Sequence, residues 1–202
     1  MPGHLILVTE DLPSEALAHR LLAHIDPDAN FNSIGRRGVG YVQSKLRSLN
    51  QAAAGMRIVA IADRDSVQKC PIEMMRAWLG GADRHPNLVV RMAEMETESW
   101  VMADREGISS FLDIPLNRVP QFPDTLVDPK QELVNIARLS RGKSIREQMC
   151  PAAGAQNVVG PAYNSVVEHF IRSAWRPTRA LVNSPSLRRA ELRIRELAQR
   201  SA

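Results

Sequence analysis

Two aspartates with one residue between them follow a short apolar segment. Residues 56–62 are mostly apolar and rich in β-branched side chains, which is typical of a buried strand in a parallel sheet. Asp63 and Asp65 come directly after this segment. Carboxylates are costly to bury, so we expect both just beyond the carboxyl end of the strand, where open α/β sheets bind ligands. Alternate residues of an extended chain point the same way, so this pair can share one Mg²⁺ ion.

Other carboxylates follow other apolar segments in the same way. Glu10 comes after the strand-like segment 4–8, and Glu96 and Glu98 come after the segment 87–93. Parallel strands end at one edge of a sheet, so we expect these groups to converge with the aspartate pair. A divalent cation would relieve their mutual repulsion, and oxygen ligands favour Mg²⁺ or Mn²⁺. The predicted metal ligands are Glu10, Asp63, Asp65, Glu96 and Glu98. The alternative is a set of solvated acids in ordinary loops.

The elements that would position these residues alternate regularly along the first half of the chain. Strand patterns alternate with helical patterns, which indicates a parallel sheet covered by helices. We expect strands at 4–8, 31–34, 56–62 and 87–93, and helices at 14–24, 41–54, 71–79 and 94–104. Ser14 is the expected N-cap of the first helix. The fold class is therefore α/β, with a parallel four-stranded, Rossmann-like sheet.

The second half of the chain has a different pattern. Prolines between 115 and 129 indicate a linker, and helical patterns follow at 131–139, at 165–175 and from Ser184 onward. We therefore predict an α/β domain at 1–114 and a helical extension at 115–202 that ends in a basic tail. We interpret Trp100 and Trp175 as core residues.

Composition limits the classes of protein that fit. Of 202 residues, 44% are apolar and 24% charged, which is ordinary for a globular protein. No apolar run is long enough for a membrane span, and the first residues lack the basic region of a signal peptide. The two cysteines, Cys70 and Cys150, form no zinc-binding motif. We expect a cytoplasmic protein without a membrane partner.

Positive charge is concentrated near the end of the sequence. Residues 172–202 carry eight arginines against two glutamates, whereas the whole chain has a net charge of +4. A basic region beside a metal site favours a polyanionic partner, so we predict contact with nucleic acid. The candidate phosphate-binding residues are Lys130, Lys143, Arg146, Arg188 and Arg189. The alternative is an ordinary solvated face.

The carboxylate pattern resembles the Toprim fold, the nucleotidyl-transfer and hydrolysis domain of topoisomerases, primases and certain nucleases. In that fold a Glu follows the first strand and an Asp-x-Asp follows the third. The matching residues are Glu10 and the segment Asp63-Arg64-Asp65, and the resemblance covers about the first 105 residues. A glycine often follows the Glu in Toprim proteins, and this chain has Asp11 there.

A closer resemblance extends over nearly the whole length. It is to a bacterial Toprim-related family of uncharacterised function, whose members are often encoded beside ATPases in defence loci. The residues that carry it lie in five segments, 85–88, 96–104, 128–130, 159–164 and 184–189. The resemblance implies an ATPase partner.

These observations lead to one functional expectation and two alternatives. We expect a Mg²⁺-dependent nuclease or phosphodiester-transfer protein, in which Glu10 is a metal ligand or a general acid/base. The first alternative is a non-catalytic Toprim-like module that regulates an ATPase complex. The second is a phosphatase with Asp63 as nucleophile, as in enzymes of the haloacid dehalogenase type. The sequence leaves open whether the substrate is DNA or RNA and whether the chain is active alone. It also leaves open the identity of the partner and the oligomeric state.

Overall fold

A computed structural model of the protein describes residues 5–35, 40–62, 71–92 and 96–200. The backbone packs into two compact units. Unit 1 contains Met1–Glu94 and Ala190–Ala202, and unit 2 contains Met95–Arg189. The division into domains 1–114 and 115–202 concerns which parts of the chain fold independently, and it stays a prediction.

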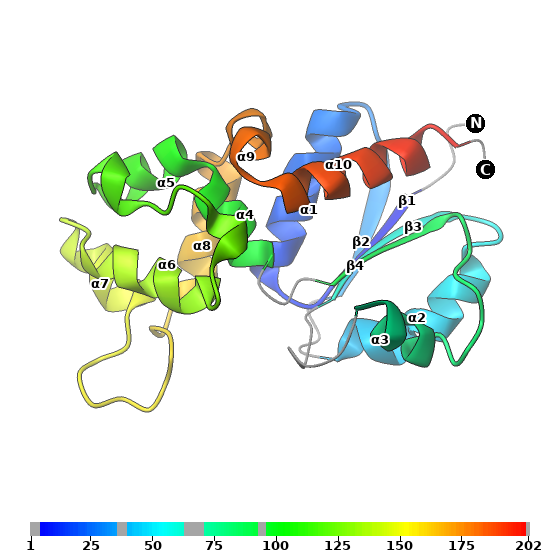
Figure 1. Cartoon of the computed structure of the whole chain (residues 1–202), viewed down its shortest axis with the longest axis horizontal. Helices are drawn as coiled ribbons and strands as arrows, with labels where there is room; N and C mark the ends of the chain where they lie inside the picture. The colour runs from blue at the N-terminus through cyan, green and yellow to red at the C-terminus, as the bar shows by residue number, and fades with distance from the viewer. Residues whose placement is uncertain (1–4, 36–39, 63–70, 93–95, 201–202) are drawn as a thin grey trace. The chain divides into compact units, whose positions relative to one another are not determined.

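Unit 1 is built on a sheet of four strands, all parallel, which confirms the predicted fold class (Figure 1). The order across the sheet is β2-β1-β3-β4. The strands are β1 Leu5–Thr9, β2 Phe31–Gly35, β3 Arg57–Ala62 and β4 Leu88–Met92. β1 and β3 are neighbours, with Val8 opposite Ala60. The two central strands therefore end at the same edge of the sheet.

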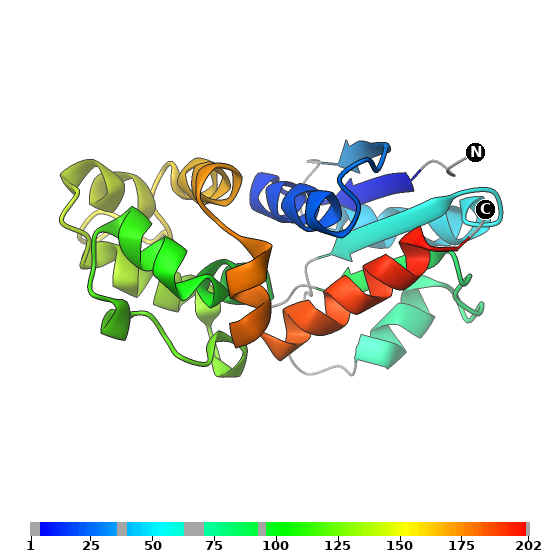
Figure 2. The same ribbon diagram turned by 90° about the horizontal axis from the view of Figure 1, so that it is seen from above.

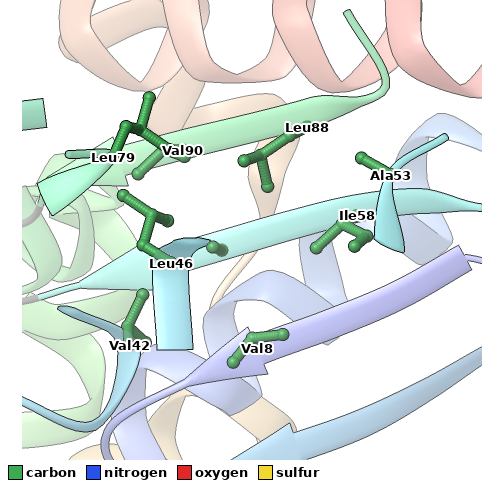
Figure 3. Close-up of a cluster of buried hydrophobic side chains, with 9 residues drawn as sticks. Val8, Val42, Leu46, Ala53, Ile58, Leu79, Leu88 and Val90 are labelled. Atoms are coloured by element: carbon green, nitrogen blue, oxygen red, sulfur yellow. The ribbon is translucent and has the colours of Figure 1, made fainter. Parts of the chain in front are cut away.

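Helices cover both faces of this sheet (Figures 1 and 2). One face carries α1 Leu12–Ile25 and the C-terminal half of α10 Pro185–Ala198, and the other carries α2 Tyr41–Ala52 and α3 Pro71–Trp78. Figure 3 shows the core beneath α2, in which Val42 and Leu46 pack against strand residues such as Ile58 and Leu88. These side chains are fully buried, so removing one would leave a cavity in the layer that holds β1 beside β3.

The start of α1 differs from the prediction. The cap is Asp11, whose side chain accepts a hydrogen bond from the Ser14 backbone N–H at 2.9 Å. Ser14 is the third residue of the helix and so cannot be its N-cap. Pro13 fits inside the first turn because that turn requires no intrahelical N–H donor. The helix thus starts two residues after Glu10, and the turn between β1 and α1 is short.

Unit 2 consists of helices joined by loops, with no strand among its described residues. Its α-helices are α4 Glu96–Ala103, α5 Arg105–Leu112, α6 Pro129–Arg138, α7 Lys143–Met149, α8 Tyr163–Ser173, α9 Pro177–Asn183 and the start of α10, and two short 3-10 helices lie at Leu116–Arg118 and Pro123–Thr125. The helices α5, α7 and α9, each of eight residues or fewer, were not predicted. The predicted helix 165–175 runs past the end of α8 at Ser173. Trp100 and Trp175 are buried, as predicted. No helix among the described residues has the length and apolar character of a membrane span.

Candidate functional site

Glu10 is the predicted metal ligand that the structure describes most completely. It directly follows β1 and is only 3% exposed. Its Oε1 accepts a hydrogen bond from the backbone N–H of Val42 at 3.0 Å. Val42 is the second residue of α2, whose N-cap, Gly40, supplies no side-chain acceptor. The carboxylate therefore completes the N-terminus of α2, where a negative charge is also favoured by the helix dipole.

The strands beside Glu10 determine which other residues leave the sheet at this edge. β3, the neighbour of β1, ends at Ala62, immediately before Asp63 in the sequence. Asp63 and Asp65 themselves lie outside the described residues. The part of the prediction that concerns strand placement is confirmed, because β1 and β3 are adjacent and parallel. The approach of the aspartates to Glu10 stays a prediction.

A glycine on the other side of β1 packs tightly against this edge. Gly35 is the last residue of β2 and pairs with Thr9, the residue before Glu10. Its φ is 154°, and a Cβ atom at this position would collide with the Thr9 carbonyl oxygen. Only glycine permits this close approach, so Gly35 helps to fix the backbone from which Glu10 extends. The predicted strand 31–34 stops one residue short of Gly35.

Glu96 and Glu98 belong to α4 in unit 2. Glu96 is the first residue of that helix, and its side chain lies outside the described part of the structure. The Glu98 carboxylate lies 3.3 Å from Lys130 Nζ and accepts a hydrogen bond from the Tyr163 hydroxyl, also at 3.3 Å. Three sequence segments that carry the family resemblance thus meet at one carboxylate. A predicted metal ligand and a predicted phosphate-binding lysine form an ion pair with each other.

The other predicted phosphate-binding residues also lie in unit 2. Lys143 is 3.7 Å from Glu147, and both side chains are exposed. Arg146 donates to the Ser140 carbonyl, and Arg188 donates to the Leu181 carbonyl at 3.0 Å. Arg189 is exposed. Because Arg146 and Arg188 bind backbone carbonyls near helix ends, they have a local structural role whether or not they contact phosphate.

Asp104 is a buried charged residue that the sequence analysis did not single out. It is fully buried at the N-terminus of α5, where it accepts the Gly107 N–H at 3.0 Å. The Arg179 guanidinium binds it through Nε at 2.5 Å and Nη2 at 2.7 Å, and the Arg176 N–H donates at 2.7 Å. The hydrogen bonds from Arg179 to Asp104 raise the pKa of Arg179. This bidentate pair fixes α9 against α5, and nothing local in the sequence predicts it.

A second buried hydrogen-bond network involves segment 184–189 at the start of α10, one of the five segments that carry the family resemblance. The Ser184 hydroxyl donates to Asp124 at 2.7 Å, and the Ser186 backbone N–H donates to the same carboxylate at 2.8 Å. The Trp100 indole N–H donates to the Ser186 hydroxyl at 2.8 Å. Ser184 also accepts the Leu187 N–H, as a helix cap does. These contacts assign the segment a packing role within unit 2.

Within the described residues, no group of three or more acidic, histidine or cysteine side chains could hold a metal ion. Glu10 is the one predicted ligand of unit 1 that can be placed, since the aspartate pair is outside these residues. Comparisons with protein-family models, curated proteins and solved structures found no match. The observations that bear on function are therefore the geometry of the sheet edge and the sequence.

Proposed function

We propose that this protein is a Toprim-like, Mg²⁺-dependent nuclease or phosphodiester-transfer protein. The observation that carries the proposal is the buried Glu10 at the end of β1, beside β3, the strand that immediately precedes Asp63. Ligands of open α/β sheets bind outside the carboxyl ends of the strands. A carboxylate held there at 3% exposure is unusual for a charged residue and favours a functional role.

In this proposal Glu10, Asp63 and Asp65 hold the cation, and Glu96 and Glu98 are further candidate ligands. The donor set contains only carboxylate oxygens, which suits Mg²⁺ or Mn²⁺. A cation so placed supplies an activated water and stabilises charge on phosphoryl oxygens. The hydrogen bond from Val42 orients the Glu10 carboxylate, as hydrogen-bonding partners of metal ligands commonly do. Glu10 can also act as general acid/base at the reacting phosphate.

The proposed substrate is nucleic acid, and the proposed partner is an ATPase that acts with this chain in bacterial defence or DNA processing. The net charge of +4 and the basic C-terminal region support a polyanionic substrate. The ATPase follows from the family resemblance. A cytoplasmic location fits both partners.

The test is cleavage of supercoiled plasmid and single-stranded DNA in Mg²⁺ or Mn²⁺. We expect little cleavage by the isolated chain and metal-dependent cleavage when the proposed ATPase partner is added. Asp63→Ala and Glu10→Gln should abolish that activity, whereas Glu147→Gln, a change at an exposed acid of unit 2, should retain it. Equal cleavage by wild type and Asp63→Ala would show that the activity comes from a contaminant and would contradict the proposal.

The second candidate function is a non-catalytic binding module of an ATPase complex. The observation that favours it is the pairing of Glu98 with Lys130 and Tyr163, which gives a predicted ligand a structural role. Titration with Mn²⁺, followed by electron paramagnetic resonance, separates the two functions. A site lost in Asp63→Ala favours the enzyme, and binding of the ATPase without any Mn²⁺ site favours the module.

A further inference from the structure

Three arginines from two distant parts of the sequence line one small pocket of unit 1. Arg84 lies in the loop before β4, Arg193 lies in α10, and Arg200 follows the end of that helix. The pocket has a volume of about 50 Å³, and Glu196 is the acidic residue among those that line it. The residues predicted from the basic C-terminal region to bind phosphate, Arg188 and Arg189, belong to unit 2.

Backbone carbonyls orient two of the three guanidinium groups. Arg84 Nη1 donates to the Leu88 carbonyl, and Arg200 Nη1 donates to the Pro86 carbonyl at 3.1 Å. A guanidinium carries five N–H donors, so one such bond positions the group and leaves donors for a ligand. Leu88 is the first residue of β4, and Pro86 lies two residues before it. The two arginines are therefore held by the scaffold rather than by carboxylates.

The third arginine is paired, but weakly. Arg193 Nη1 donates to Glu196 at 2.8 Å on the surface of α10, with both side chains more than half exposed. Exposed pairs at this helical spacing contribute little to stability, so Arg193 can reach a ligand at small cost. The pocket lining thus holds three positive charges and one negative charge.

Bringing these like charges together is unfavourable without an anion. Burial, and then the positive charges of Arg193 and Arg200, lower the pKa of the Arg84 guanidinium. An anion in the pocket would relieve this repulsion. An oxyanion with several acceptors would also use the N–H groups that the backbone bonds leave over.

We propose that Arg84, Arg193 and Arg200 bind one phosphate group. Arginine is suited to this ligand because its planar fork matches phosphate oxygens. A cavity needs roughly 10–15 Å³ to hold one water molecule, so a pocket of about 50 Å³ has room for about four oxygen-sized atoms. That is the size of a phosphate group. A divalent phosphate would balance the excess charge of the lining.

The position of this pocket separates it from the proposed metal site. Arg84 precedes β4, whereas Glu10 follows β1, and the strands are parallel. The two sites are therefore at opposite ends of the sheet, separated along the strand direction by about 17 Å for strands of five residues at roughly 3.3 Å each. A phosphate bound at the arginines is not the reacting one. This inference goes beyond the proposed function and does not require a metal.

The experiment measures binding of inorganic phosphate to the full chain by isothermal titration calorimetry and ³¹P NMR. It is done with EDTA present and with ionic strength held constant by chloride. We expect saturable binding by the wild type that Arg193→Gln weakens at least roughly fivefold, since a charge-assisted contact is lost. Arg172→Gln is the matched control, because Arg172 is an equally charged surface residue of α8 that pairs with Glu168. It should bind phosphate as the wild type does.

A variant that binds phosphate more tightly shows that a loss of binding elsewhere does not come from unfolding. Glu196→Gln removes the one negative charge of the lining and should tighten phosphate binding severalfold, which a destabilised protein cannot do. A wild type without saturable binding, or an Arg193→Gln variant that binds like the wild type, would overturn the proposal. A short single-stranded oligonucleotide then distinguishes the sources of the phosphate. If Arg193→Gln weakens the binding of both phosphate and the oligonucleotide, the site binds a nucleic acid backbone. If it weakens the binding of phosphate alone, the site binds a small phosphorylated ligand.

Discussion

The carboxylate of Glu10 accepts the backbone N–H of Val42 at 3.0 Å, across 32 positions of sequence. One residue thus does two things that can be separated: it completes the N-terminus of α2, and it presents negative charge at the carboxyl edge of the sheet. The candidate metal site is built partly from a group that the fold itself requires. Substitutions at Glu10 must therefore be chosen so that their effect on the stability of the protein can be measured separately from their effect on its activity.

Glu10→Gln and Glu10→Ala should separate these roles. Glutamine keeps an oxygen acceptor for Val42, so its free energy of unfolding should fall by less than about 1 kcal/mol, whereas alanine should cost about 1–3 kcal/mol because a buried N–H loses its partner. Both should lose metal-dependent cleavage, since a neutral amide is a poor Mg²⁺ ligand. Urea unfolding and the plasmid assay measure the two effects. Full activity in a stable Glu10→Gln variant would reduce Glu10 to a helix cap.

Gly35→Ala should disturb the site without touching a charged group. A Cβ atom there meets the Thr9 carbonyl, so the end of β2 must move away from β1. We expect a loss of about 1–3 kcal/mol, the usual cost of forcing extra atoms into a packed region. Gly55→Ala is the control, because a Cβ at Gly55 has open space around it, and it should change stability by less than about 0.5 kcal/mol. Similar melting temperatures for both variants would contradict this account.

Asp104→Asn should be among the most damaging substitutions in unit 2. Asp104 is fully buried and Arg179 is about one third exposed, so the cost should be near the lower end of the range for broken buried pairs, about 3 kcal/mol. A double-mutant cycle with Arg179→Gln isolates the pair. The exposed pair of Glu168 and Arg172, treated in the same way, should give about 0.5 kcal/mol or less. A coupling no larger than that of the control would show that Arg179 is dispensable.

Cys150 should react slowly with alkylating reagents in the folded protein. Burial raises the pKa of its thiol, and the positive charges of Arg138 and Arg146 only partly oppose this. A raised pKa means less thiolate at any given pH, so the rise of iodoacetamide reactivity with pH should be displaced upward from that of free cysteine. The measurement uses a Cys70→Ser background, so that Cys150 alone reports. Reaction at the free-cysteine rate near pH 8 would contradict the prediction, and urea should restore reactivity.

Arg188→Ala and Arg189→Ala should differ in stability. Arg188 donates to the Leu181 carbonyl near the end of α9, whereas Arg189 is exposed. We expect Arg188→Ala to cost about 0.5–1 kcal/mol, typical of a cation near a helix C-terminus, and Arg189→Ala almost nothing. DNA binding measured over a series of salt concentrations tests the functional role of these arginines. Each lost phosphate contact should flatten the slope of the log binding constant against the log salt concentration by roughly 0.7–0.9. An unchanged slope for both variants would remove them from the nucleic-acid interface.

The sequence by itself determined the parallel sheet and the place of Glu10 at its edge. Both follow from local signals, because apolar periodicity specifies strands and helices, and the alternation of these elements makes the strands parallel. It also identified Trp100 and Trp175 as core residues. It missed the short helices α5, α7 and α9, since seven or eight residues carry too few turns for a clear periodicity.

Only the tertiary structure decided which charges meet. Four such interactions join residues that are 32 to 109 positions apart in the sequence. They are Glu10 with Val42, Asp104 with Arg179, Glu98 with Lys130, and Arg84 with Arg193. A side chain's charge and shape are readable from sequence, but its partner depends on how helices pack after the chain has folded, because ion pairs and hydrogen bonds act over a few ångströms. For that reason the sequence identified a basic C-terminal region, and only the fold placed Arg193 and Arg200 of that region beside Arg84 in the loop before β4.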